Sequence, residues 1–561
     1  MMKRVLSLLI AVYFLFSGCS KFLDEDNKSG ITNDEFYKTK VGFESLMTAS
    51  YNSLRDVYGQ DGENAPWLFF AGTDMYQRPR SNSDETLMRY TQLFPTEGRV
   101  LAFYKNVYGG IQRVNMGLHY IDGAKLDDAL KTQYRAELTF LRAFYHFLLL
   151  EQFGGIVINA EATLSPRTNI PRSSLQESYA FIISEMEKSV ENLPVSNLRF
   201  GKAAGYHYLA KVYVTKGWDL KDNAAFTKAK EYALKAIDGK AITIPFETLW
   251  SPKNENNAEF LFSVQYDPAS LPSNTSGNAQ QAFFGPYLGG TETGLKKYMA
   301  AIVYPSWSLH TFYGQNDARY NATFMLTIYN SYYDYYEADT SKSNITAYYP
   351  RVWGRDFTTA DSLAWINAHK TRLKKGFVMY PFKSNEEAYR YAYERDMTTP
   401  GIKKFDSPAS KEVWSTRASV RDIVLARRAE TYFLYAEACI GLNQFTEAAQ
   451  YVQKVLDRPG NAKDGTRLLP SNDIAAASSQ SEAKDFYLIE SAKEFAGEFL
   501  RWPELRRLGK LKEFNQRYNY DIKNVIESAL PGDVAKRYRP IPQSAIDLND
   551  ALTAQDQNPG Y

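Results

Sequence analysis

Aromatic side chains are the residues of this sequence best able to contact a ligand. They make up 15% of its 561 residues, as 41 Tyr, 33 Phe and 8 Trp. Tyr joins a flat apolar face to a polar tip, so it suits half-wet surfaces on which ligands stack. Between residues 245 and 418 the aromatics cluster among Gly, Pro, Ser and Asn, and long irregular segments of this kind commonly carry function. The clusters lie at 283–287, 304–307, 312–313, 332–336 and 348–350.

Metal, nucleophile and phosphate chemistry have no matching motif in the sequence. The five His are scattered, and the two Cys, Cys19 and Cys439, form neither a Cys-x-x-Cys unit nor a disulfide framework. There is no Gly-rich phosphate loop and no Gly-x-Ser-x-Gly elbow. The 66 basic and 64 acidic residues give a net charge of +2, which argues against a surface that neutralises nucleic-acid phosphates. We therefore expect no metal, no cofactor and no nucleic-acid partner.

The first residues predict an exported, lipid-anchored chain. Lys3 and Arg4 precede an apolar run over 5–16, and the small residues Ser17 and Gly18 come directly before Cys19. This arrangement resembles the lipobox of bacterial lipoproteins, so residues 1–18 are expected to be a leader and Cys19 the lipidated residue. Three acyl chains exceed what stable anchoring needs. The alternative is an ordinary secretory signal with a chance cysteine.

Two helix pairs with matching patterns are expected to form the scaffold. Helices are predicted at about 35–58, 107–118 and 133–150, the last apolar on most sides, so that His146 is interpreted as a hydrogen-bonded core residue. Large and small residues share one face in two later segments, as in tetratricopeptide-like repeats, whose helix pairs form a core by stacking. Cys439 is then a packed small residue. The repeat positions are Tyr206, Leu209, Ala210 and Tyr213 with Ala229, Ala233 and Ala236, then Tyr432, Tyr435, Ala436 and Cys439 with Ala448, Val452 and Val455.

Several stretches spread over nearly the whole chain resemble the SusD/RagB family of outer-membrane lipoproteins. The resemblance begins at 19–24 and is most specific near the C-terminus, where 494–509 and 539–561 match the family's signatures. Asp317 and Arg319 match its Asp-x-Arg signature. The other matching stretches are Tyr104, Tyr108, Ile111 and Asn115, then 135–137, 154–155 and 428–438.

The resemblance implies a mostly α fold, a tetratricopeptide-like helical repeat scaffold with long loop-rich insertions that form the ligand-binding face. After the leader it implies a lipid-anchored linker at 19–34 and a single domain at 35–561. Repeat helices would occupy about 35–240 and 420–460, the loop-rich insertion about 245–418 and the C-terminal signature 490–561. The implied function is to bind glycan at the cell surface and deliver it to a TonB-dependent outer-membrane transporter, without catalysis.

Candidate ligand contacts come from two regions. The first is an early loop where the family commonly places sugar contacts, and the second is the middle insertion. On grounds of exposed aromatic character, the predicted contacts are Trp67, Asp74, Tyr76 and Arg78 in the early loop, and Tyr304, Trp307 and Tyr313 in the middle.

The charged residues of the C-terminal signature are interpreted as structural. Arg and Trp at 501–507, with Glu494 and Glu498 nearby, suit a buried ion network that holds the C-terminal segment against the repeats. Two other functions stay open. A surface glycoside hydrolase would need a pair of carboxylates about the scissile bond, and no such pair stands out. A repeat scaffold could instead bind peptide or protein ligands in its groove.

Overall fold

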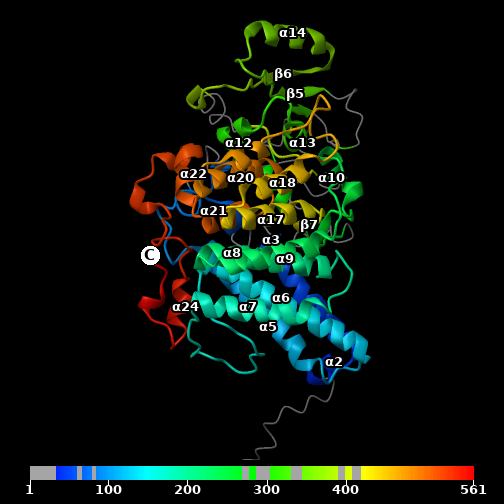
Figure 1. Cartoon of the computed structure of the whole chain (residues 1–561), viewed down its shortest axis with the longest axis vertical. Coiled ribbons are helices and arrows are strands. Elements are labelled where there is room, and N and C mark those ends of the chain that lie inside the picture. Colours follow the sequence, from blue (N-terminus) through cyan, green and yellow to red (C-terminus); the bar gives the residue numbers. More distant parts are fainter. Residues whose placement is uncertain are drawn as a thin grey trace, which may run out of the picture.

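The computed structural model describes residues 33–59, 66–78, 84–267, 277–285, 303–329, 336, 344–388, 399–406 and 419–561. Cys19 and the predicted leader lie outside these residues. The body is a stack of helices, with α2 (Asn33–Lys38) at one end of the long axis and α14 (Thr359–His369) at the other (Figure 1). The predicted mostly α fold is confirmed. No helix within the described ranges has the length and apolarity needed to cross a bilayer.

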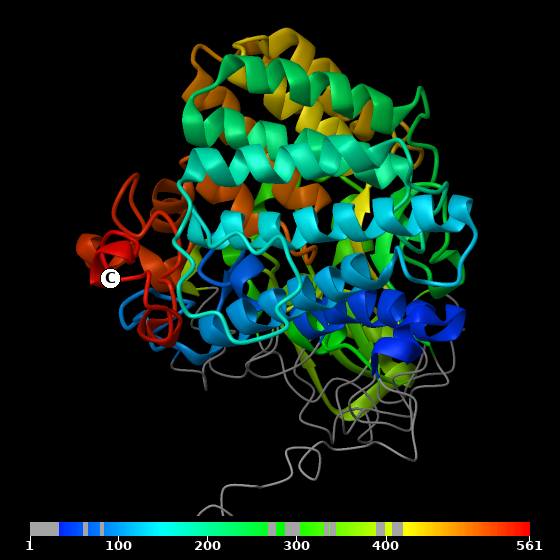
Figure 2. The same ribbon diagram turned by 90° about the horizontal axis from the view of Figure 1, so that it is seen from below.

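The N-terminal half is a succession of helices that pack on their sequence neighbours, as Figure 2 shows from below. The helix predicted at 35–58 divides at Thr39, whose hydroxyl accepts a hydrogen bond of 3.0 Å from the Gly42 N–H and so begins a new helix. Asp127 caps α6 in the same way, accepting from Leu130 N–H at 2.8 Å. The helices are α3 (Lys40–Tyr58), α5 (Gly98–Tyr120), α6 (Asp128–Phe153) and α7 (Leu175–Val190).

Helix α6 is buried along almost all of its length, as its apolar sequence predicts. His146 lies fully inside, where its Nδ1–H donates to the Arg142 carbonyl at 2.8 Å and its Nε2 accepts from the Asn159 N–H at 3.2 Å. Burial lowers the pKa of His146 to about 4, so the ring is neutral at physiological pH. The interpretation of His146 as a core residue is confirmed.

The two predicted repeat pairs are α8 (Lys202–Leu220) with α9 (Asn223–Ile237), and α17 (Arg428–Gly441) with α18 (Phe445–Leu456). Helix α17 also packs on α8 and α9, so the two pairs stack on each other. Phe226 fills the crossing because both neighbouring helices have glycine there. A Cβ built at Gly217 or Gly441 would lie 2.5 or 2.6 Å from its ring. Cys439 is fully buried in this core, as predicted.

A buried ion network surrounds Glu494 at the end of α20 (Gln480–Glu494). The Glu494 carboxylate contacts Arg319 at 3.2 Å, Arg427 at 2.9 Å and Arg458 at 3.2 Å. Burial by itself would raise the pKa of Glu494, but the three guanidinium groups hold it well below its usual range. Arg319 also binds Asp317 at 2.7 Å, so the Asp-x-Arg signature belongs to this network.

The arginines of α21 (Arg501–Arg507) reach other helices and the early loop. Arg501 binds Asp74 at 2.6 Å, Arg506 binds Asp219 of α8 at 2.8 Å, and Arg507 binds Glu437 of α17. The predicted buried network is confirmed, with one correction. Glu494 and Glu498 pair with arginines and a lysine outside α21, so the C-terminal segment is held by two separate sets of ion pairs.

The strands form three small sheets within the described residues. Strand β1 (Tyr76–Gln77) pairs antiparallel with β3 (Tyr304–Pro305), and β2 (Phe260–Val264) pairs antiparallel with β7 (Ile423–Arg427). Strand β5 (Ile345–Tyr348) pairs antiparallel with β4 (Thr327–Tyr329) and parallel with β6 (Leu373–Met379). The third sheet and α14 lie together at one end of the molecule (Figure 1).

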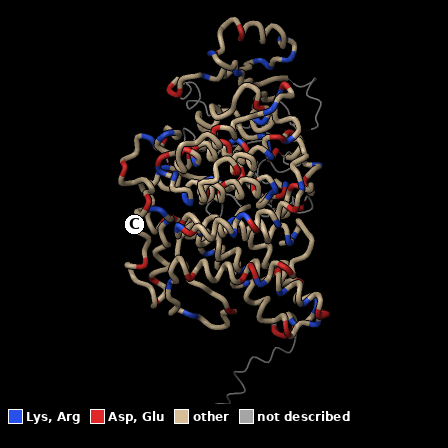
Figure 3. Tube along the Cα trace, in the orientation of Figure 1, with Lys and Arg blue, Asp and Glu red and all other residues tan. Residues whose placement is uncertain are grey.

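The remaining helices are short and join these parts. Basic and acidic residues are interspersed along the described trace, without a face of one sign (Figure 3). The short helices are α4 (Trp67–Phe70), α10 (Phe246–Leu249), α11 (Gln280–Phe284), α12 (Trp307–Phe312), α13 (Arg319–Thr323), α19 (Ser471–Ala476), α22 (Leu511–Tyr518), α23 (Tyr520–Lys523) and α24 (Gln543–Asp547).

Candidate functional site

Four of the aromatic side chains predicted to contact a ligand are buried. Trp67 packs edge-on against Phe283, with 5.3 Å between ring centroids. Tyr76 and Tyr304 lie on the buried β1–β3 pair, and the Tyr313 hydroxyl donates to the Lys493 carbonyl at 2.9 Å. The prediction that these four rings are exposed is wrong, because contacts with segments distant in the sequence bury them in the core.

The two charged residues predicted with them are held by partners in the C-terminal part of the chain. Asp74 is fully buried, and both its oxygens accept from Arg501, at 2.8 Å from Nε and 2.6 Å from Nη2. The Arg78 guanidinium binds Glu85 at 2.9 Å, and its backbone N–H donates to Asp521 at 2.8 Å. The early loop is thus fastened to the signature segment.

Trp307 is the predicted aromatic contact that stays half-buried in the described part of the chain, and it packs with Tyr380 and Phe382 on the same apolar cluster. Its Nε1–H donates to the Lys383 carbonyl at 3.0 Å, which fixes the plane of the indole. Trp307 and Phe382 both pack against one small apolar cluster beneath β4 and β5. We call Trp307, Arg351, Trp353 and Phe382 the aromatic–arginine cluster.

Arg351 organises this cluster. Its guanidinium carbon lies 3.7 Å from the ring centroid of Trp353, 4.2 Å from that of Phe382 and 5.0 Å from that of Tyr320. Its Nη1–H donates to the His310 carbonyl at 2.6 Å. A cation sandwiched between rings and tied to a backbone oxygen has little rotamer freedom left, so the half-exposed indole of Trp353 is held in one orientation.

A second group of half-exposed rings lies on α14 and the sheet beneath it. Trp365 stacks on Tyr348 of β5, with 4.2 Å between centroids and 10° between planes. His369 stacks on Trp365 at 4.1 Å, and Phe377 of β6 lies 5.5 Å away. No residue of α14 is fully buried, and Leu363 is 57% exposed. This helix therefore presents apolar side chains, Leu363 among them, at its surface.

Two titratable groups at this end of the molecule are poorly suited to proton transfer near neutral pH. Asp361, the carboxylate at the start of α14, has its pKa held well below the usual range by hydrogen bonds from Arg355 and Thr358. His310, behind Arg351, has its pKa lowered to about 3, first by burial and then by the Arg351 charge. A carboxylate that stays ionised and a ring that stays neutral are poor proton donors.

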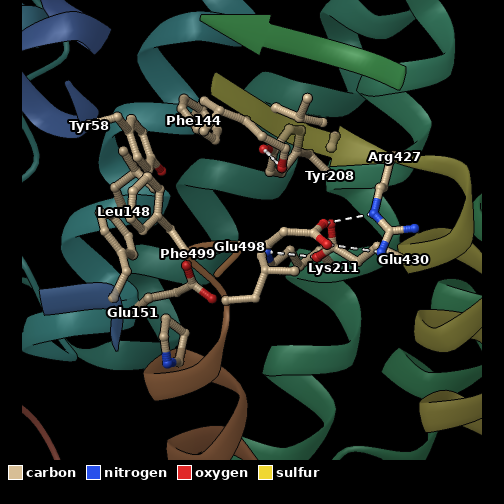
Figure 4. A pocket seen from close by; sticks show the side chains of 16 residues that line it. Tyr58, Phe144, Leu148, Glu151, Tyr208, Lys211, Arg427, Glu430, Glu498 and Phe499 are labelled. Carbon is tan, nitrogen blue, oxygen red and sulfur yellow. Dashed lines mark hydrogen bonds and ion pairs between the residues drawn. The ribbon is translucent and has the colours of Figure 1, made fainter. Parts of the chain in front are cut away.

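A small cavity between the repeats and α21 holds buried charges, as Figure 4 shows. Lys211 binds Glu430 at 3.0 Å, and Arg427 binds Glu498 at 2.7 Å. Glu151 faces the same cavity, and burial raises its pKa. The charged residues that line it are buried, so these ion pairs hold the core together and are not open to a ligand. The described residues contain no group of three or more His, Cys, Asp or Glu placed to hold a metal ion.

The sequence profile of the SusD family matches residues 259–561, which is more than half of the chain. The chain belongs to the SusD family. A second SusD-like profile, described as starch-binding and associating with the outer membrane, matches residues 21–214. The resemblance inferred from the sequence is therefore confirmed.

Relatives of this SusD-family chain cover it almost completely. "SusD-like protein P38" of Formosa agariphila is 23% identical over 536 residues, which cover 91% of this chain and 93% of that protein. "SusD-like protein P2" of the same organism is 25% identical over 574 residues and covers both chains fully.

Solved structures share the fold at low sequence identity. A laminarin-binding SusD-like protein has a TM-score of 0.64 at 19% identity, covering 94% of this chain and 100% of its own. Surface glycan-binding protein A of Bacteroides thetaiotaomicron has a TM-score of 0.66 at 18% identity, covering 93% and 99%.

Five residues of these aromatic groups in this SusD-family chain were not predicted from the sequence: Arg351, Trp353, Trp365, Phe377 and Phe382. Trp365 carried a usable signal, because Leu363 and Trp365 are apolar residues on a short helix that opens with the capping box of Thr358. Trp353 lies three residues beyond a Tyr-Tyr-Pro cluster that was noted. The stacking of Arg351 between two rings has no sequence signal, because Trp353 and Phe382 are 29 residues apart in the numbering.

Proposed function

We propose that this SusD-family protein is a cell-surface glycan-binding lipoprotein, anchored through Cys19, that captures oligosaccharide or polysaccharide for a TonB-dependent outer-membrane transporter. The observation that carries the proposal is the group of half-exposed, fixed aromatic rings around Arg351 and on α14. The C–H faces of sugars stack on such rings, and guanidinium groups donate to their hydroxyls. The descriptions of a laminarin-binding structure and a starch-binding profile support it.

The position of this surface suits capture from outside the cell. Residue 33, where α2 begins, follows Cys19 by 14 residues, a length of chain that reaches at most about 50 Å. Helix α14, which carries Trp365, and strand β6, which carries Phe377, lie at the opposite end of the long axis from α2 (Figure 1). A chain tethered at Cys19 would present its aromatic end away from the anchored end.

Single substitutions test the binding surface. In a panel of neutral glycans bound to the purified protein, Trp353→Ala or Trp307→Ala should weaken the best ligand about tenfold, as loss of a stacking residue does. Phe94→Ala is the matched control, because Phe94 is 58% exposed and lies outside the cluster. Equal affinities for wild type and both tryptophan variants would place glycan binding elsewhere.

The protein is proposed to bind without cleaving. A general acid for glycoside hydrolysis needs a carboxyl with a raised pKa at the sugar. Burial raises the pKa of Glu151 and Glu504 in the interior and that of the partly exposed Asp422 to about 6, and none of the three belongs to the aromatic–arginine cluster or to α14. Prolonged incubation with a bound glycan should leave its chain length unchanged. New reducing ends that disappear on one Asp or Glu substitution would favour the glycoside hydrolase alternative.

Transporter delivery is tested by association. Gentle detergent extraction of native membranes, followed by capture of this protein, should recover a large TonB-dependent barrel protein. The same barrel should be recovered with Trp307→Ala, because the proposed contact uses the helical repeats and not the aromatic surface. Capture of the protein without any barrel would leave a free-standing glycan binder.

A further inference from the structure

A groove on the helical body, separate from the aromatic surface, carries donors that the protein does not use. It runs between α3, Tyr134 of α6, the loop before α8 and the end of β2, and has a volume of about 460 Å³. Leu198 forms one lip and is 46% exposed. The apolar floor consists of Met47, Leu54, Phe262 and Val264.

Arg199 is fixed in this groove before any ligand arrives. Its guanidinium carbon lies 5.4 Å from the Tyr51 ring centroid and 5.0 Å from that of Tyr134. Its Nε is 2.7 Å from Glu137, and Tyr51 donates to the same carboxylate at 2.8 Å. The Arg199 Nη2 group is buried and has no hydrogen-bond partner in the described part of the chain. A buried N–H group without an acceptor is costly unless a ligand accepts its hydrogen bond, even where the charge itself is paired as it is here with Glu137.

Gln265 and Arg55 add to this donor surface. The Gln265 Nε2 group is also buried and unpartnered among the described residues. The carbonyl of Gln265 accepts from Arg55 at 2.9 Å from Nε and 2.6 Å from Nη2. The Arg55 guanidinium carbon lies 4.9 Å from the centroid of the Tyr266 ring, and the Arg55 charge acts on the nearby Asp422 carboxyl. Glu44 is the one carboxylate among the residues that line the groove.

We infer that this groove is a second binding site that takes a carboxylate-bearing sugar, a uronic acid unit, with its carboxylate on the Arg199, Gln265 and Arg55 donors. The two donors without a partner among the described residues, next to the guanidinium groups of Arg199 and Arg55, favour a ligand that is anionic and accepts hydrogen bonds. The apolar floor and the Leu198 lip suit the C–H face of a sugar ring. The carboxylate follows from the donors, whereas the sugar rests on the proposed function.

The experiment compares trigalacturonate with its methyl ester, which has the same rings without the charges. Isothermal titration should show that the purified protein binds the acid at least tenfold more tightly than the ester. Gln265→Leu and Arg55→Met should each weaken the acid about tenfold. Arg167→Gln is the matched control, because it removes one exposed positive charge away from the groove. Gln265→Leu removes a donor that has no partner, so its melting temperature should not fall.

The outcomes separate this inference from the proposed function. Trp353→Ala should leave trigalacturonate binding unchanged while it weakens neutral glycans. Equal binding of acid and ester, or equal binding by wild type and Gln265→Leu, overturns the inference and leaves neutral-glycan binding untouched. Binding of triglutamate at the groove in place of trigalacturonate would also overturn it, since the occupant would then be a peptide. If the wild-type protein bound trigalacturonate but no neutral glycan, the result would count only against the proposed function.

Discussion

Asp74 distinguishes a ligand contact from a structural residue more sharply than any other predicted site residue. Its carboxylate forms two parallel hydrogen bonds with Arg501, and the side chains of the pair are 0% and 3% exposed. Removing one partner of a buried ion pair costs about 3–5 kcal/mol, because the other charge stays buried without its counterion. In Asp74→Asn, Arg501 still has Glu504 as a counterion at 2.9 Å. The substitution should therefore lower the free energy of unfolding by about 3 kcal/mol, the lower end of that range.

The assay is urea unfolding followed by tryptophan fluorescence, since the buried Trp502 is adjacent to Arg501 in the chain. The transition midpoint of Asp74→Asn should fall clearly below that of wild type. The protein that remains folded should bind glycan with unchanged affinity. Asp473→Asn makes the same chemical change at an exposed position of α19, and should shift stability by less than about 0.5 kcal/mol.

The opposite pattern would refute this reasoning. A tenfold loss of glycan affinity for Asp74→Asn, with an unchanged unfolding midpoint, would mean that Asp74 contacts ligand and that its pairing with Arg501 contributes little. The sequence-based prediction of a sugar contact at Asp74 would then stand.

Three further outcomes are expected. Burial alone would raise the pKa of Glu430, but Lys211 and His207 lower it to about 2 from the ordinary 4.5. The ionised Glu430 therefore stabilises the folded protein fully above pH 4.5, and this stabilisation is lost as the pH falls toward 2. Between pH 6 and pH 3 the melting temperature should fall less steeply for Glu430→Gln than for wild type. Burial raises the pKa of the Cys439 thiol to about 12, so iodoacetamide at pH 8 should alkylate it only after denaturant is added, and rapid native labelling would contradict the packed core. Cys19→Ala should leave the membrane fraction in low salt, whereas a variant retained after a carbonate wash would exclude the lipid anchor.

Local patterns in the sequence were sufficient to predict the helical scaffold. The small residues of α9 and α18 recur at helical spacing, and that spacing is a property of the helix itself, so the crossing with α8 and α17 could be predicted without coordinates. The charged C-terminal signature was also predictable as a buried network, because Arg and Glu concentrated on short helices must find counterions when buried. Only the structure shows which counterions, since Arg501 and Asp74 are 427 residues apart.

Which aromatic rings are exposed was decided by tertiary structure alone. Tyr and Trp suit both a core and a wet surface, so their residue type leaves burial open. Tyr76 is buried because the Gly497 N–H, 421 residues away, donates to its hydroxyl at 2.5 Å. Trp353 stays half-exposed at the edge of the core, where Tyr320 lies 5.5 Å from its ring and the Arg351 guanidinium 3.7 Å. Helical periodicity is a local property that the sequence determines, whereas the exposure of a ring depends on which distant segments reach it.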